Sequence, residues 1–175
     1  MLGADDLSIG PRFAGVDPII ARRPDGDVVH NKTLGVLLKF VQMPHWRPSY
    51  WEGQLTMPGS EASLNLIFEV NGDEAPHAGH ELIVLGARKM QIWKTVEAMP
   101  LINAALSENE YSEVTSDDCV LRLIRVGSSP LMDYDLGFCV RTLPHLVFVV
   151  THRGTRPHQV RVDSGCDLSY SGEVT

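Results

Sequence analysis

The sequence predicts an α+β domain in which an antiparallel sheet carries one or two helices packed on one face. Three observations predict this fold: an alternating pattern at residues 51–70, a helical pattern at 78–110, and four strand-like segments between 119 and 163. Side chains of a strand point alternately to its two faces, so the alternation indicates a sheet with one buried face. A hairpin followed by helices and then by strands is the order of an α+β domain.

The first segments indicate strands. Residues 51–57 and 62–70 alternate between apolar or small and polar side chains, and Pro58-Gly59-Ser60 between them supplies a turn, so we expect a hairpin. A short strand is predicted at 27–30. The segment 34–43 is ambiguous, because its leucines also fit a helical face.

The stretch 78–110 is the most helical. Its apolar residues recur at spacings of three, four and seven, which places along one helical face Leu82, Leu85, Ile92, Trp93, Val96 and Met99. Pro100 divides the stretch and is expected to start a second helix, because proline is tolerated in a first helical turn.

The C-terminal part returns to strands, predicted at residues 119–126, 137–142, 145–152 and 158–163. Leu143-Pro144 is interpreted as a turn. Residues 147–150 are apolar on both faces, so we expect that strand to be central in the sheet.

The length of 175 residues and the hydrophobic content of 43% suit one domain with one core. We therefore expect a single domain over residues 1–175, with an irregular N-terminal arm at 1–26 and a loose tail at 166–175. The longest apolar run, residues 146–150, is far shorter than the ~20 residues of a membrane span.

The compartment is predicted from the N-terminus and the cysteines. Residues 1–6 lack the basic and then apolar pattern of a signal peptide. Cys119, Cys139 and Cys166 are odd in number and widely spaced, which favours reduced thiols. A cytoplasmic protein is expected.

The charge is acidic and unevenly spread. A net charge of −7 makes nucleic acid a poor partner and a basic protein a better one. An acidic run without Lys or Arg contains Glu108, Glu110, Glu113, Asp117 and Asp118. A solvated face is the simpler interpretation of the run, and a partner-binding surface is the functional one.

Motifs of catalysis are missing from the sequence. There is no glycine-rich phosphate loop and no nucleophile elbow. His77 and His80 could present two imidazoles to Zn²⁺, although no complete ligand set is visible and surface residues at a helix start are the simpler interpretation. We expect no catalytic residue, metal or cofactor.

Two other groups of polar residues are candidates for chemistry. His152, Arg153, Arg156 and His158 could form a cationic rim that binds an anion. Carboxylate pairs such as Asp133 and Asp135 could serve acid–base work, but turn residues are the simpler interpretation.

Aromatic residues cluster before the predicted hairpin. Trp51 shares the apolar face of its strand, so we expect it in the core. Trp46 and Tyr50 flank prolines and are candidate partner-binding residues, because exposed aromatics anchor interfaces.

The segment Tyr50-Trp51-Glu52-Gly53-Gln54-Leu55-Thr56-Met57-Pro58 resembles the opening hairpin of small uncharacterised bacterial domains. In those, Trp-x-Gly and a proline-ended strand precede an apolar strand, helices and a C-terminal sheet. The resemblance covers about residues 50–163. Such domains resemble immunity proteins, which neutralise a bacterial toxin by binding it, and the resemblance implies no catalytic residues.

Three functions follow as expectations. The first is a non-catalytic, immunity- or antitoxin-like protein that binds a partner, such as a basic toxin, through an acidic and aromatic surface. The second is a metal- or His-dependent enzyme that acts on a small anion with His77, His80 and His152. The third is a structural subunit of a larger assembly.

Overall fold

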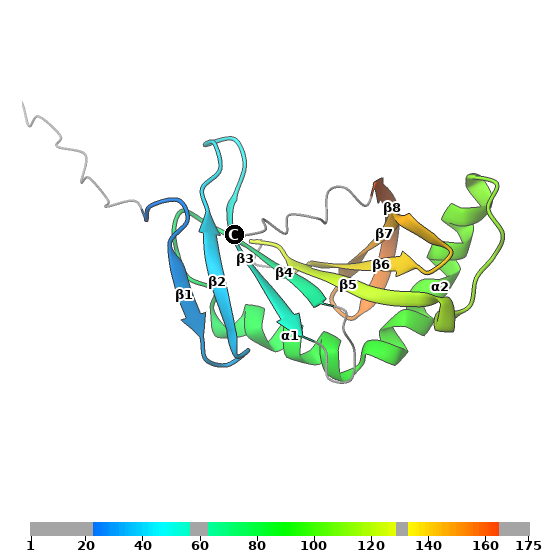
Figure 1. Ribbon diagram of the computed structural model, residues 1–175, viewed down its shortest axis with the longest axis horizontal. Helices are drawn as coiled ribbons and strands as arrows, with labels where there is room; N and C mark the ends of the chain where they lie inside the picture. Colours follow the sequence, from blue (N-terminus) through cyan, green and yellow to red (C-terminus); the bar gives the residue numbers. More distant parts are fainter. Residues whose placement is uncertain (1–22, 57–62, 129–132, 165–175) are drawn as a thin grey trace, which may run out of the picture.

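The computed structural model describes residues 23–56, 63–128 and 133–164, which form one sheet of eight strands with two helices on one face (Figure 1). This confirms the α+β fold that the sequence predicts. The strands follow one another across the sheet in chain order. Neighbouring strands pair antiparallel except β4 and β5, which are parallel. A parallel pair needs a long crossover connection, and the two helices supply it.

The first half of the sheet is a meander of four strands: β1 (Val28–Asn31), β2 (Val36–Val41), β3 (Ser49–Thr56) and β4 (Ser63–Val70). The predicted hairpin is confirmed, since β3 and β4 pair over their whole lengths. Its predicted turn lies outside the described residues. The ambiguous segment 34–43 contains strand β2, because pairing with β1 and β3 on its two sides outweighs its helical spacing.

Helices α1 (Ala78–Lys89) and α2 (Gln91–Glu108) run along one face of the sheet, nearly end to end (Figure 1). The predicted break at Pro100 is wrong, because the chain breaks at Met90 and Pro100 lies inside α2. Proline has no N–H, so the Val96 carbonyl receives no helical hydrogen bond there. Pro100 is exposed, where water can replace that bond. Neither described helix is long and apolar enough to cross a membrane.

The second half begins with a 3-10 turn, η1 (Ser116–Asp118), and continues through β5 (Cys119–Val126), β6 (Tyr134–Val140), β7 (Leu143–Arg153) and β8 (Arg156–Ser164). All four predicted strands are present. The predicted turn at Leu143-Pro144 is wrong, since both residues belong to β7 and the turn falls at residues 141–142. Residues 147–150 are buried as expected, but β7 lies next to the edge strand β8 instead of mid-sheet.

The main core lies between the sheet and the helices. The sheet contributes Phe40, Trp51, Phe68, Phe138 and Phe148, and the helices contribute Val84, Ala98, Ile102 and Leu106. Trp51 is fully buried, which confirms the sequence prediction. Burial of an aromatic side chain removes a large apolar area from water, so these rings dominate the stabilisation of the sheet–helix interface.

The Trp-x-Gly segment has a physical explanation in β3. The Trp51 indole packs 5.1 Å from the Phe40 ring, between centroids, and its Nε1–H donates a hydrogen bond of 2.7 Å to the Glu74 carbonyl. Two residues later, the absence of a side chain at Gly53 lets β2 approach: an added Cβ would lie 2.8 Å from the Leu37 carbonyl oxygen. The tryptophan thus joins the hairpin to the segment before α1, and the glycine sets the spacing of β2 and β3.

Candidate functional site

The outer face of the two helices is apolar and exposed. An apolar helical stripe usually faces the core, but Leu82, Ile92 and Trp93 are 68%, 83% and 58% exposed. Leu85 and Val96 are exposed as well, and Met99 is half-buried. This stripe therefore lies on the outer side of the helices and not in the core. We call the exposed set the helical apolar face: Leu82, Leu85, Met90, Ile92, Trp93 and Val96.

The helices pack on the sheet through other residues. The inward side consists of Val84, Ala87, Ala98, Ile102, Ala105 and Leu106, together with the polar His80, Lys94 and Thr95. Apolar residues thus occupy both sides of each helix. Helical spacing identifies a stripe but cannot choose between two apolar stripes. The inward stripe has mostly small residues, which let the helix axis come near the sheet.

The helical apolar face continues along α2 through the exposed Pro100 and Ala104. Charged residues adjoin it at two places. Arg88 and Lys89 lie in the last turn of α1, where the face crosses from one helix to the other, and Glu108 ends α2. A contiguous exposed apolar surface with a polar border is typical of a protein interface.

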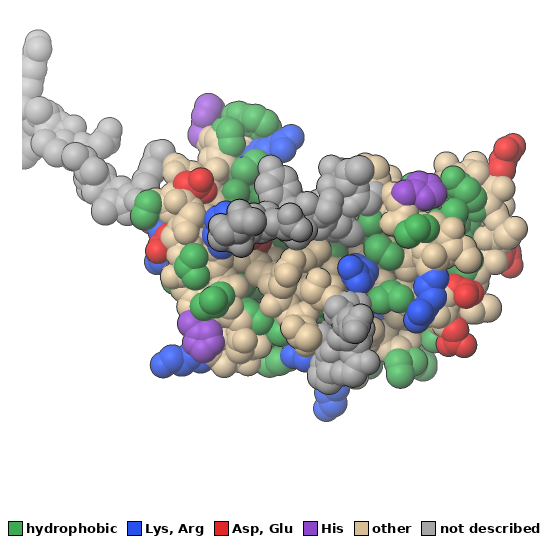
Figure 2. Space-filling model, in the orientation of Figure 1, with side chains coloured by type: hydrophobic (Ala, Val, Ile, Leu, Met, Phe, Trp, Pro, Cys, Tyr) green, Lys and Arg blue, Asp and Glu red, His purple; other side chains and the backbone are tan. Residues whose placement is uncertain are grey.

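The acidic run lies at the C-terminal end of α2 and in the connection to β5. Glu108, Glu110, Glu113 and Asp117 are exposed, and Figure 2 shows acidic side chains gathered at that end of the molecule. Described residues in the last turn of α2 include no basic side chain to offset the negative end of the helix dipole. These carboxylates therefore repel one another and the helix end, so a cationic group would be attracted there.

Two residues of the acidic run also have local structural roles. Glu110 adopts φ 62°, the left-handed conformation that ends many helices, and Tyr111 N–H donates to the Leu106 carbonyl at 2.9 Å as in a Schellman motif. Asp118 accepts hydrogen bonds of 2.9 Å from the backbone N–H and hydroxyl of Thr115. These bonds lower the pKa of the Asp118 carboxyl. Asp118 is thus the third residue of η1 and completes a capping box with the N-cap residue Thr115.

The two candidate aromatic residues lie elsewhere. Trp46 is 65% exposed in the β2–β3 connection, where the Arg47 guanidinium carbon lies 4.6 Å from the centroid of its ring. It lines a cavity of about 590 Å³ with Arg23, His45 and Asp73. Tyr50 is half-buried in β3, on the sheet face away from the helices, because its neighbour Trp51 points toward them.

The candidate partner-binding residues therefore form two separate surfaces. The β2–β3 connection and the end of α2 lie at opposite ends of the molecule (Figure 1). Helix α2 contacts β7 and β8, at the other end of the sheet from β2 and β3. The helical apolar face lies between the two ends, and its residues are of the kind that a helix usually buries.

His77 and His80 form a capping box at the start of α1. The Nδ1 of His77 accepts the Gly79 N–H at 3.0 Å, the Nδ1 of His80 accepts the His77 N–H at 3.3 Å, and the rings stack with centroids 3.8 Å apart. One nitrogen of each ring therefore satisfies a backbone donor of the helix end. In the described ranges no three of His, Cys, Asp and Glu are grouped so as to hold a metal ion.

His152 is buried and does not belong to a cationic rim. It is 0% exposed and stacks on Tyr134, with centroids 4.8 Å apart. Its Nδ1–H donates to the Val150 carbonyl at 3.1 Å, and its Nε2 has no hydrogen-bond partner within the described part of the chain. The neighbouring Lys94 is also buried and donates 2.6 Å to the Thr155 carbonyl. Arg153, Arg156 and His158 remain exposed.

Acid is expected to destabilise the fold through His80 and His152. Burial, and for His80 also the neighbouring His77, lowers the pKa of both imidazoles from 6.5. The unfolded chain therefore takes up protons before the folded chain does. Stability is complete above about pH 6.5 and falls as the pH drops through the window down to the folded pKa values, by up to about 1.4 kcal/mol per pH unit for each group.

Urea unfolding at a series of pH values checks this dependence. The His152→Asn variant is expected to have a shallower loss of stability below pH 6.5, whatever its absolute stability, because one titrating group is gone. A slope equal to that of the native chain would contradict the role given to His152.

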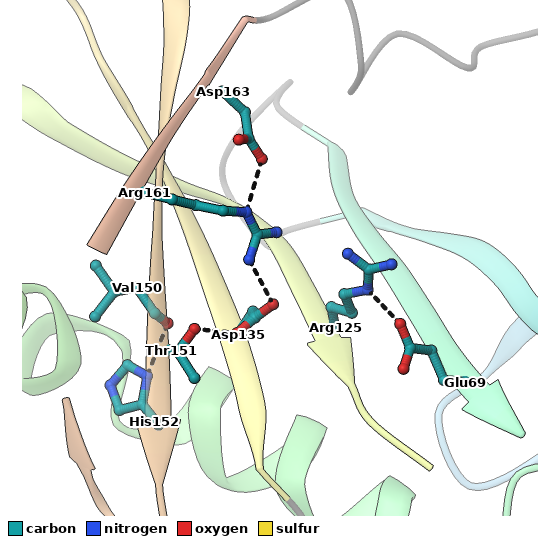
Figure 3. Close-up of polar contacts among 8 residues, drawn as sticks. All are labelled: Glu69, Arg125, Asp135, Val150, Thr151, His152, Arg161 and Asp163. Atoms are coloured by element: carbon teal, nitrogen blue, oxygen red, sulfur yellow. Dashed lines mark hydrogen bonds and ion pairs between the residues drawn. The ribbon is translucent and has the colours of Figure 1, made fainter. Parts of the chain in front are cut away.

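The other face of the sheet carries ion pairs across the strands (Figure 3). Glu69 accepts from Arg125 at 2.8 Å, and Arg161 bridges Asp135 at 3.3 Å and Asp163 at 3.1 Å. Each such pair contributes about 0.2–1 kcal/mol at a partly exposed position. Asp135 also accepts the Thr151 hydroxyl at 2.7 Å. This carboxylate is therefore used in strand pairing.

The thiols on β5 and β6 are poorly placed to act as nucleophiles. Burial and the neighbouring Asp118 raise the pKa of Cys119 to about 11, and burial raises the pKa of Cys139. A thiol must ionise to attack, so these two remain in the unreactive form near neutral pH. Cys166 lies outside the described residues.

Comparison of the chain with models of known protein families, with curated proteins and with solved structures found no match.

Proposed function

We propose that this chain is a protein-binding domain whose interface is the helical apolar face. The exposure of Leu82, Ile92 and Trp93 on the outer side of the two helices carries the proposal. A folded chain gains nothing from large apolar side chains held in water, whereas their burial against a partner contributes about 25 cal/mol per Å² of apolar area. Tryptophan in the middle of such a surface is the type of residue that concentrates binding energy.

The narrower form of the proposal is an immunity- or antitoxin-like protein that neutralises a toxin by binding it. The Trp-x-Gly hairpin supports this class through its resemblance, and the carboxylates beyond α2 support a basic partner by complementarity. Such a protein acts by occlusion and requires no reactive group of its own. Co-expression with a toxin tests this form: protection of the cells should be lost when the carboxylates beyond α2 are replaced.

Binding is expected to depend on Ile92. The substitution Ile92→Glu places a charge in the middle of the helical apolar face and should weaken partner binding at least tenfold, about 1.4 kcal/mol. Ile92 is 83% exposed, so the free energy of unfolding should change by less than about 0.5 kcal/mol. Affinity capture with tagged native and variant chains, followed by identification of the retained proteins, is the measurement.

Leu37→Glu is the matched control. Leu37 is a large apolar residue, 65% exposed, on β2 and away from the helices. Its variant should retain the same proteins as the native chain. Equal retention by the native chain, Ile92→Glu and Leu37→Glu would show that the helical apolar face is not the interface.

A further inference from the structure

We propose that the helical apolar face binds a second copy of this chain, with the two α2 helices antiparallel across a two-fold axis. This inference rests on the proposed function, namely that the face is a protein interface. It adds the identity and the orientation of the partner. The distribution of charge and side-chain size along α2 supports both.

Charge is distributed unevenly along α2. Its N-terminal end follows Arg88 and Lys89, and its C-terminal end carries Glu108 and leads into Glu110 and Glu113. The helix dipole has the same direction, positive at the N-terminus and negative at the C-terminus. Lys94, near the N-terminal end, points inward, is buried and pairs with Glu97 at 3.4 Å, so these two opposite charges largely offset each other. From 95 to 121 the sequence has no Lys or Arg.

An antiparallel pair of such helices is complementary to itself. The basic end of each α2 meets the acidic end of the other, at two equivalent places. A parallel pair would instead bring like charges together at both ends. Two-fold dimers are the commonest closed assemblies and use one self-complementary surface on each subunit. The 18 residues of α2 extend about 27 Å, which is long enough to separate the two charged ends from the apolar middle.

Side-chain size fits the same arrangement. A two-fold axis beside residues 98 and 99 places Trp93 opposite Ala104 of the second copy, and it brings Lys89, which precedes the break at Met90, toward Glu108 of that copy. Trp93 is 58% exposed and Ala104 is exposed, so a large side chain meets a small one at each end of the apolar stretch. Val96 and Pro100 lie between these contacts, and Ile92 lies next to them on the N-terminal side. Interdigitation of large and small residues is how helices pack closely.

The first experiment measures the mass of the full chain by sedimentation equilibrium over a range of concentrations. The native chain and Leu37→Glu should approach twice the 19.3 kDa of one copy, and Ile92→Glu should remain near 19.3 kDa. A native chain that stays monomeric at all concentrations overturns the inference. If Ile92→Glu then still abolishes capture of another protein, the proposed function stands without it. A dimer that persists in Ile92→Glu also overturns the inference, because it must use a different surface.

The second experiment tests the orientation by charge reversal at low salt. Lys89→Glu and Glu108→Lys should each weaken the dimer about fivefold or more, and the double variant should recover the native dissociation constant, because each reversed charge again faces its opposite. Both positions are exposed, so the variants should fold. Failure of the double variant to recover, with Ile92→Glu still monomeric, would overturn the antiparallel arrangement.

Discussion

Replacing Trp51 with alanine is expected to lower the free energy of unfolding by about 3–5 kcal/mol. The indole is fully buried, packs on Phe40, and lies 5.0 Å from the Arg23 guanidinium carbon. Its loss leaves a cavity and removes the donor to the Glu74 carbonyl. The free energy of unfolding of a domain is about 5–15 kcal/mol, so this one substitution removes a large fraction of it. Urea unfolding followed by circular dichroism is the measurement.

Trp46→Ala provides the same substitution at an exposed position. Because Trp46 is 65% exposed, its loss should change stability by less than about 0.5 kcal/mol. Trp51→Phe should fall between the two, because it retains a ring and loses the hydrogen bond, and it remains measurable if the alanine variant does not fold. Similar losses for Trp46→Ala and Trp51→Ala would contradict the central place of Trp51 in the core.

Replacing Gly53 with alanine is expected to lower the free energy of unfolding by about 1–3 kcal/mol, although only one methyl group is added. That group would lie 2.7 Å from the Leu38 Cδ2 atom and 2.8 Å from the Leu37 carbonyl oxygen. The leucine side chain can turn aside, but the carbonyl belongs to the backbone of β2. Strand β2 must therefore move away from β3, and their ladder is strained.

Gly86→Ala is the control for Gly53→Ala, with an expected effect of opposite sign. Gly86 lies inside α1, and apart from its chain neighbours and the backbone of its own helix no atom lies within 4 Å of the position that its Cβ would take. Alanine there should raise the free energy of unfolding by about 0.5–1 kcal/mol, because glycine is costly in a helix interior. A destabilised Gly86→Ala, or a neutral Gly53→Ala, would show that the space around each glycine does not decide the outcome.

The fold could be predicted from the sequence wherever a short segment carries its own secondary-structure pattern. The β3–β4 hairpin has alternation in both strands, and that alternation predicts which side chains share the buried face, as the pairing of Trp51 with Phe68 and of Leu55 with Leu64 confirms. Segment 34–43 lacked such a signal. This segment forms a strand because it pairs with β1 and β3. No short window of the sequence contains all three strands.

The candidate site was harder to predict because its residues are of the type expected in a core. Ile92 and Trp93 occupy a helical stripe, and a stripe of this kind usually packs inward. The alternative stripe of Ala98, Ile102 and Ala105 is less hydrophobic, yet it fits against the sheet. The fit of each stripe against the sheet determines which one packs inward. The sequence of the helix alone therefore does not show which stripe is buried.

The sequence also could not show whether Trp46 and the acidic run form one surface. Both surfaces contain exposed residues, but they lie at opposite ends of the molecule (Figure 1), because Trp46 follows β2 whereas α2 packs on β7 and β8. Composition indicates which residues are polar or aromatic. It does not indicate which of them meet.

The parallel pairing of β4 with β5 has a consequence for how the chain folds. In each meander, strands pair with their neighbours in the chain, so the entropy lost on closing each connection is small. Joining the meanders brings Asn65 beside Leu123, and the whole helical crossover must be closed first. Contacts between residues so distant in the chain form slowly. The rate of forming the complete sheet therefore depends on this one seam, and the two meanders can form their own ladders before it.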